Sequence, residues 1–155
     1  MRIELLNIEP LIWRRVQIDG KASLAALHHV IGVAFGWSDA HLHEFDISGR
    51  LYGNLKQVNI ELQEDVLDGR KQVIAITATE VEAAFSYQYD LGDGWEHRIV
   101  VERIEAIDEP VGYARVLAGE RACPQEDVGG PGGYAALIAC IQGDSTSEEA
   151  RRYFD

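Results

Sequence analysis

The segment 85–91 restricts the fold more than any other part of the sequence. Aromatic and apolar residues alternate with polar ones along it, which is the period of two expected of a strand with one buried face. The tripeptide Gly92-Asp93-Gly94 follows, and Gly and Asp adopt the conformations that a tight turn requires. A second β-rich run then returns over 97–104. The sequence therefore predicts an antiparallel hairpin, and with it a sheet.

Four further stretches are predicted to extend this sheet. Residues 2–8 and 11–18 have extended character and are joined around Pro10, which cannot donate a ladder hydrogen bond and so belongs in the connection of a β-hairpin or corner. Residues 40–52 have the pattern of a strand and its return. The β-branched run 73–79 is typical of a buried strand.

Helical spacing of apolar residues appears in two places. The first helix is predicted to begin after Ser23, an N-cap, and to end at Gly36. The second covers 134–141 and ends at Gly143, and the capping-box spacing after Ser145 predicts a last short helix. Strands outnumber helices and connect mostly through short turns. We therefore expect an α+β fold, a mostly antiparallel sheet with two to three helices packed on it, in one domain over 1–155.

The net charge of −12 bears on the partners. Nucleic-acid affinity depends on Lys and Arg that neutralise phosphates, so nucleic acid is not the expected partner. Glu4 and Glu9 interrupt the N-terminal segment, and no stretch reaches the ~20 apolar residues of a membrane span. We expect a cytoplasmic protein without a membrane partner. The two cysteines, Cys123 and Cys140, lack the spacing of a zinc site or a disulfide framework.

Residues with chemical potential concentrate in three segments, 39–45 (DAHLHEF), 89–97 (YDLGDGWEH) and 123–130 (CPQEDVGG). In the first segment two His at i and i+2 on a strand would point the same way, and imidazole and carboxylate ligands bind divalent cations. A metal hypothesis therefore uses His41, His43, Asp93 and His97. The alternative reading is structural: the His side chains hydrogen-bond to backbone or carboxylates, while Trp37, Trp95 and Phe45 fill the core.

Two charged residues are expected to serve the structure. Asp90 follows three aromatic residues in a strand and either faces solvent or needs a buried partner. Arg14 lies on the apolar face of its own segment, so an Arg14–Asp90 ion pair is the expected outcome.

The segment 123–130 runs into a glycine-rich stretch before a helix. It lacks the Gly-Lys-Ser/Thr ending of a phosphate-binding loop, so that function is rejected. Helix capping and loop anchoring are the favoured roles for Glu126 and Asp127, with acid/base chemistry or metal binding as the alternative. These two carboxylates are also expected to raise the pKa of the Cys123 thiol, which argues against a cysteine nucleophile.

Several motifs occur in a specific order: IEPLIWRRV, LAALHHVIGVAFGW, DAHLHEF, YDLGDGWEH, and LAGERACPQEDVGG followed by GGY. Together they resemble the plasmid-borne ORF-three-like family first named from a Ri plasmid, over nearly the whole chain. The resemblance implies a mobile-element association, and some members carry a resolvase-like label. The chain departs from the family pattern at Val116, Gln125 and Val128, so a cysteine-based zinc site is not expected. The residues matching the motif positions that we take as a candidate site are Arg14, Trp37, His41, His43, Asp90, Asp93, Trp95, His97, Glu126 and Asp127.

Three functions compete at this point. The first is a non-enzymatic binding module that recognises a protein or small ligand through a polar-aromatic cleft. The second is a metal-dependent hydrolase, whose ligands or base are His41, His43, His97 and one or more of Asp93, Glu126 and Asp127. The third is a nucleic-acid accessory factor of a mobile element, which the sparse basic residues disfavour. The sequence implies no particular cofactor beyond the divalent metal of the second hypothesis.

Overall fold

The computed structural model describes residues 1–54, 66–106 and 114–143. Within these ranges the strands form one sheet in the order β5-β4-β3-β6-β7-β1-β2-β8. The strands are β1 (Arg2–Leu5), β2 (Ile12–Gln17), β3 (His43–Ile47), β4 (Arg50–Gly53), β5 (Val66–Asp68), β6 (Ala84–Tyr89), β7 (Trp95–Val100) and β8 (Arg115–Glu120). The helices are α1 (Leu24–Phe35), α2 (Ile74–Thr77) and α3 (Gly130–Ile141).

The pairing of the strands is antiparallel except between β4 and β5, which run parallel. The expected α+β class and mostly antiparallel sheet are therefore confirmed. Three predicted hairpins form as expected: β1 with β2 around Pro10, β3 with β4, and β6 with β7.

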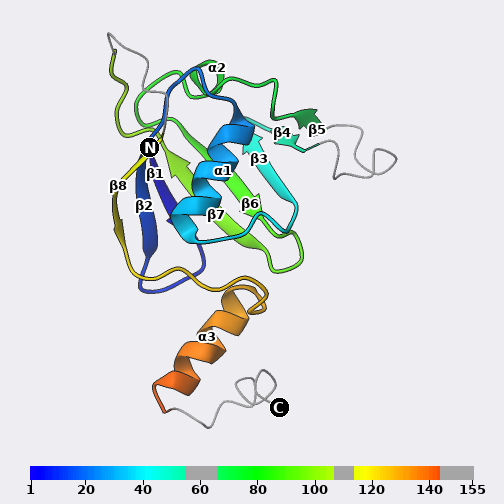
Figure 1. Ribbon diagram of the computed structural model, residues 1–155, viewed down its shortest axis with the longest axis vertical. Helices are drawn as coiled ribbons and strands as arrows, with labels where there is room; N and C mark the ends of the chain where they lie inside the picture. The colour runs from blue at the N-terminus through cyan, green and yellow to red at the C-terminus, as the bar shows by residue number, and fades with distance from the viewer. Residues whose placement is uncertain (55–65, 107–113, 144–155) are drawn as a thin grey trace.

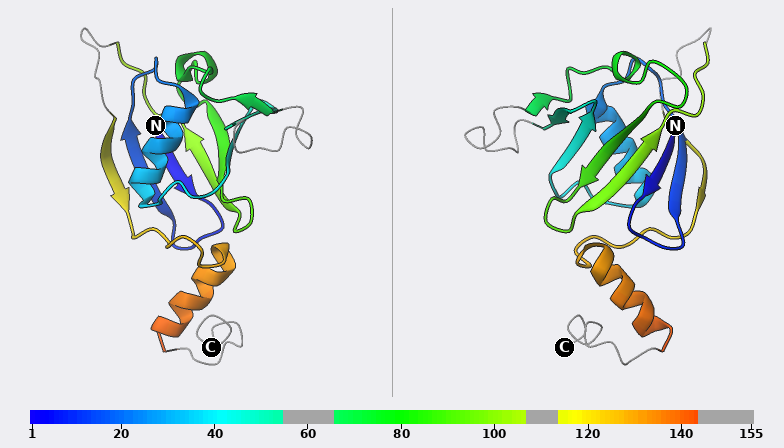
Figure 2. Two further views of the ribbon diagram at one scale, coloured as in Figure 1. Left: turned by 45° about the vertical axis from the view of Figure 1, so that its right-hand side comes forward. Right: turned by 180° about the vertical axis from the view of Figure 1, so that it is seen from behind.

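The sheet and α1 make two layers. Helix α1 crosses one face of the sheet (Figure 1), and the strands bury alternate residues beneath it. Seen from behind, the strands lie in front of α1, and none of the described helices covers this second face (Figure 2). That face carries ion pairs, such as that of Arg15 in β2 with Glu102, which follows β7, at 2.6 Å. The core consequently lies between the sheet and α1.

Local signals explain why α1 forms where it does. The Ser23 hydroxyl accepts a hydrogen bond from the Ala26 amide at 3.2 Å, and Gly36 ends the helix in the left-handed conformation at φ 81°. Both predicted ends are confirmed. Leu24, Leu27 and Ile31 are fully buried at helical spacing, so the apolar stripe faces the sheet.

Two parts of the fold differ from expectation. The run 73–79 forms the short helix α2 instead of a strand, because Ile74 and Ala78 are buried while Ile76 is 70% exposed. A strand would place all three on one face. Strand β8 is not among the predicted strands, and it pairs with β2.

The helices do not all pack on the sheet as expected. Ile74 and Ala78 of α2 join the core cluster, but α3 projects beyond the end of the sheet (Figure 1). Its C-terminal part confirms the predicted helix 134–141, although the helix already begins at Gly130. The last short helix, predicted after Ser145, lies outside the described residues.

Candidate functional site where three segments meet

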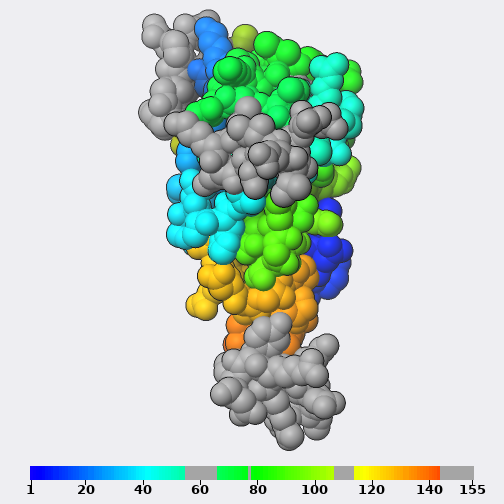
Figure 3. All heavy atoms as spheres, turned by 90° about the vertical axis from the view of Figure 1, so that its right-hand side faces the viewer, coloured from blue at the N-terminus to red at the C-terminus, as the bar shows by residue number. Residues whose placement is uncertain are grey.

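The three segments 39–45, 89–97 and 123–130 come together at the end of the sheet from which α3 projects (Figure 3). His41 lies in the loop before β3, with its Nδ1 3.5 Å from Asp90 Oδ2 and its Nε2 3.2 Å from Asp127 Oδ1. One ligand atom from each of the three residues lies within 4.8 Å of the other two. Each segment thus contributes one side chain to the same small group.

The chain turn after β6 fixes Asp90. Its backbone has φ 53°, its amide donates to Leu42 O at 2.8 Å, and its carbonyl accepts from Gly94 N at 2.7 Å. Oδ1 accepts hydrogen bonds from the Gly92 and Asp93 amides. Oδ2 is the oxygen that faces His41. Asp90 is therefore held by the turn itself.

Glu126 anchors the third segment to the other two. Its Oε1 accepts a hydrogen bond from the Tyr89 hydroxyl at 2.5 Å, and its Oε2 accepts one from the Ser38 amide at 2.8 Å. Burial raises the pKa of Glu126, but these hydrogen bonds outweigh it and hold the pKa below its usual range. Burial and the Glu126 hydrogen bond together raise the pKa of Tyr89, which stays protonated and donates. Glu126 is thus an ionised anchor.

Loop anchoring is therefore confirmed for Glu126, but helix capping is not. Helix α3 has no side-chain cap hydrogen bond at its N-cap, Gly129. Instead the Gly129 amide donates to Asp93 Oδ2 at 3.1 Å, which ties the start of α3 to the β6–β7 turn. Asp127, with φ 59° and a 77% exposed side chain, faces His41.

Arg14 does not pair with Asp90, so the expected ion pair is wrong. Its guanidinium reaches across from β2 and donates to the carbonyls of Ala34, Trp13, Glu120 and Arg121, and to Cys123 Sγ at 2.8 Å. Arg14 therefore joins α1, β2 and the chain after β8. The partner of Asp90 is His41.

Replacing Arg14 with Met should lower the free energy of unfolding by about 2 kcal/mol, because four backbone carbonyls lose a charged donor, two of them in part-buried hydrogen bonds. The matched control is Arg15→Met at the next position, whose partner Glu102 lies on the sheet's outer face. We expect a smaller effect there, since the Arg15–Glu102 pair is partly exposed to solvent, which weakens it. Urea denaturation of both variants measures the difference. Equal losses in the two variants would contradict this role for Arg14.

Five of the predicted site residues, with Trp37 among them, lie elsewhere or in the interior. Arg14 is one; His43, Trp95 and His97 are buried, the last two completely. The His43 ring stacks on His28 at 3.5 Å, and the His97 ring lies among Phe35, Trp37 and Tyr87. The metal hypothesis requires the ligand atoms of His41, His43, Asp93 and His97 to lie close together. Within the described residues, these four side chains do not form such a group.

The aromatic side chains form the floor of the site and not its surface. Trp37 stacks on Tyr89 with ring centroids 5.0 Å apart, and both are almost fully buried. The Trp37 indole N–H donates to Pro124 O at 3.0 Å. Because these aromatic rings are buried, the surface of the site is polar.

A cavity of about 810 Å³ lies at the other end of the sheet, around Val16, Ala75 and Val101. None of its lining residues belongs to the three segments.

Sequence reasoning missed Tyr89 and the pair His28–His29 as candidate site residues. A signal for His28 existed, because it lies four residues after Leu24 and three before Ile31, on the apolar stripe of α1. The predicted cause of the Cys123 pKa shift also differs. Burial raises the pKa of this thiol, and the nearby Arg14 opposes the shift.

The comparisons with known proteins agree with the order of motifs. The family described as plasmid pRiA4b ORF-3-like protein matches residues 1–155. The chain belongs to this family. A relative from Sinorhizobium fredii, named uncharacterized protein y4hQ, is 35% identical over 142 residues, which is 91% of this chain and 71% of the relative.

A solved structure shares the fold. The crystal structure of the protein of unknown function MM3350 from Methanosarcina mazei Go1 has a TM-score of 0.81 and 29% identity, and the match covers 98% of this chain and 84% of that one. The similarity therefore includes the described strands and α1. Among the helices described for this family member, none has the length and apolar character to cross a membrane.

Proposed function

We propose that this plasmid pRiA4b ORF-3-like protein is a binding module whose site is the meeting point of the three segments. In this proposal a divalent cation binds to His41, Asp90 and Asp127. The observation that carries it is the geometry: one ligand atom from each residue lies within 4.8 Å of the others. The three residues are far apart in sequence, so the fold, and not local spacing, brings them together.

The charge of this group supports a cation. Two carboxylates face one imidazole, and Asp90 and Asp127 have no cationic partner other than His41 among the ion pairs of the described residues. Two carboxylates and one imidazole favour a cation such as Mn²⁺, because oxygen ligands suit Mn²⁺ better than softer ions. Asp127 is 77% exposed, so a bound cation would keep solvent-facing positions. A carboxylate or phosphate of a protein or small ligand would occupy those positions.

The experiment is a calorimetric titration of the purified protein with Mn²⁺. We expect Asp127→Asn and His41→Ala each to weaken Mn²⁺ binding at least tenfold, since each removes a ligand. The matched control is Asp46→Asn, another exposed Asp, whose Oδ1 accepts the Gly49 amide in the β3–β4 turn. Wild-type affinity in Asp127→Asn, or no Mn²⁺ binding to the wild type, would reject the proposal.

A metal-dependent hydrolase is the second candidate. One observation favours it: the group supplies only three protein ligands, and catalytic metal sites keep a position open for water. A panel of phosphoesters and esters tested with Mn²⁺ separates the two functions. Turnover that His41→Ala abolishes would replace the binding module with the hydrolase, whereas the binding module predicts cation binding without turnover.

A further inference from the structure

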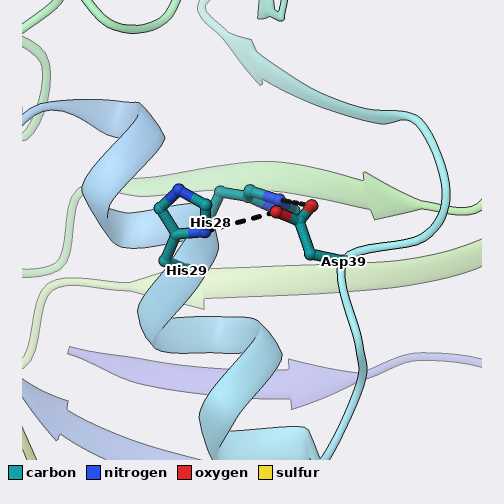
Figure 4. Close-up of side chains that lie close together, drawn as sticks. All are labelled: His28, His29 and Asp39. Carbon is teal, nitrogen blue, oxygen red and sulfur yellow. Dashed lines mark hydrogen bonds and ion pairs between the residues drawn. The ribbon is translucent and has the colours of Figure 1, made fainter. Parts of the chain in front are cut away.

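A second group of metal-ligand side chains lies on α1 and in the loop after it, with no residue in common with the group just described. His28 and His29 are consecutive residues of the helix, and Asp39 follows in the loop after it. The Asp39 carboxylate points at both rings (Figure 4). Its Oδ1 lies 2.5 Å from His28 Nε2, and its Oδ2 lies 3.4 Å from His29 Nδ1. One ligand atom from each of the three lies within 4.8 Å of the others.

The burial of the three residues suits a site that is fixed on one side and open on the other. The His28 side chain is 3% exposed, whereas those of Asp39 and His29 are 39% and 66% exposed. A cation from solvent can therefore reach the group, while His28 attaches it to the core. The His28 ring is held in place by stacking on the buried His43, at 3.5 Å between centroids and 10° between planes.

The remaining nitrogen of His28 has the partner that a metal-binding imidazole needs. His28 Nδ1 lies 2.7 Å from the Tyr87 hydroxyl. Metal-binding His residues usually hydrogen-bond through their second nitrogen, which fixes the tautomer. A hydroxyl donates or accepts equally well. Without a cation, the Tyr87 hydroxyl can donate to Nδ1 while Nε2–H donates to Asp39. With a cation on Nε2, the same hydroxyl can accept a hydrogen bond from Nδ1–H.

The ring would stay neutral during this exchange. Burial lowers the pKa of His28, an effect that Asp39 only partly offsets, so neutral imidazole is favoured. Neutral imidazole is the form that binds metals. On metal binding Nε2 releases its proton to water and Nδ1 takes one from water, so the ring keeps one proton throughout.

We propose that His28, His29 and Asp39 form a zinc site that is separate from the His41 group. Two imidazoles and one carboxylate suit zinc, with water in the fourth position. The two groups flank the loop that joins α1 to β3: Asp39 belongs to one and His41, two residues later, to the other. Cation binding at either group would therefore fix the same loop.

The test is a titration of the full chain with Zn²⁺ alone at pH 7.5, with Asp39→Asn and His29→Ala as the variants. Asn tolerates the left-handed backbone of Asp39, which has φ 63°. The matched control is Asp46→Asn, at an exposed Asp beside the β3–β4 turn that belongs to neither group. Asp127→Asn is titrated as well, to report Zn²⁺ binding at the other group. We expect Zn²⁺ affinity to fall at least tenfold in both variants and to stay within twofold in the control.

A second measurement follows the ring directly. Nitrogen-15 NMR of the imidazoles should show the His28 proton moving from Nε2 to Nδ1 when Zn²⁺ is added. Affinity that falls only in Asp127→Asn would overturn the zinc site and leave the Mn²⁺ proposal standing. Wild-type Zn²⁺ affinity in both variants, no zinc binding at all, or an unchanged His28 spectrum would also overturn it.

Discussion

Acidification from pH 6.5 to pH 4 should reduce the free energy of unfolding by about 3 kcal/mol through His97 alone. Burial lowers the pKa of His97 from 6.5 to about 4. Its Nδ1 lies 3.3 Å from Tyr87 O, and its Nε2 has no hydrogen-bond partner within the described residues. The folded state therefore has no place for a second ring proton, which the unfolded chain accepts readily.

The sign follows from proton uptake. Between pH 6.5 and 4 the unfolded state binds the proton and the folded state does not, so stability falls as the pH falls through this window. Burial also lowers the pKa of His43 to about 3, which acts in the same direction. Urea denaturation at a series of pH values measures the slope.

His97→Gln isolates the contribution of this residue. We expect the slope of unfolding free energy against pH to decrease by up to about 1.4 kcal/mol per pH unit in this variant. The control is His29→Gln, because the His29 side chain is 66% exposed and hydrated in both states. A wild-type slope in His97→Gln would show that His97 takes up its proton inside the folded protein.

The second large effect is expected at Gly130. A Cβ there would lie 2.2 Å from the Asp93 carbonyl oxygen, and the backbone has φ 67°, a region that side chains disfavour. Gly130→Ala must therefore separate the start of α3 from the β6–β7 turn. We expect a loss of about 3 kcal/mol in unfolding free energy. Mn²⁺ affinity should also fall at least tenfold, because Asp127 lies three residues earlier.

Gly132→Ala is the matched control in the same helix. A Cβ at Gly132 meets nothing within 4 Å, and Ala favours a helix over Gly by about 1 kcal/mol. This variant should therefore be as stable as the wild type or slightly more stable, with unchanged Mn²⁺ affinity. Thermal unfolding of the pair, together with the Mn²⁺ titration, checks both expectations. If the two variants behave alike, the close packing at Gly130 does not control the site.

Short-range signals explain the parts of the fold that the sequence predicted well. The ends of α1 depend on the hydroxyl of Ser23 and the left-handed backbone of Gly36, and both act within one helical turn. The β6–β7 hairpin depends on alternation and on the turn after Asp90. Such features need no information from distant residues.

The missed elements depend on distant partners. Strand β8 is exposed along almost its whole length and forms because β2 offers a free edge, as in the pair Trp13–Glu120. No local alternation reveals it. In α2 the β-branched composition favours a strand. A helical turn forms instead, because it buries Ile74 and Ala78, which are four residues apart, on the same side.

The candidate site shows the same division. The sequence identified the three segments. However, strand alternation was predicted from residue 40 onward, whereas β3 begins only at His43. His41 lies in the preceding loop and meets Asp127, whereas His43 enters the core with Phe45. The residue types at the site were therefore predictable, and their grouping required the conformations of two loops.

The strand order has a consequence for how the chain folds. Strand β1 lies between β2 and β7, and its register pairs Arg2 with Val100. The N-terminal hairpin therefore cannot join the rest of the sheet until nearly two thirds of the chain has left the ribosome. Until then Ile3 and Leu5, which are fully buried in the native protein, are open to chaperones and to aggregation. Pairing over such a sequence separation also slows folding compared with a helical bundle of the same size.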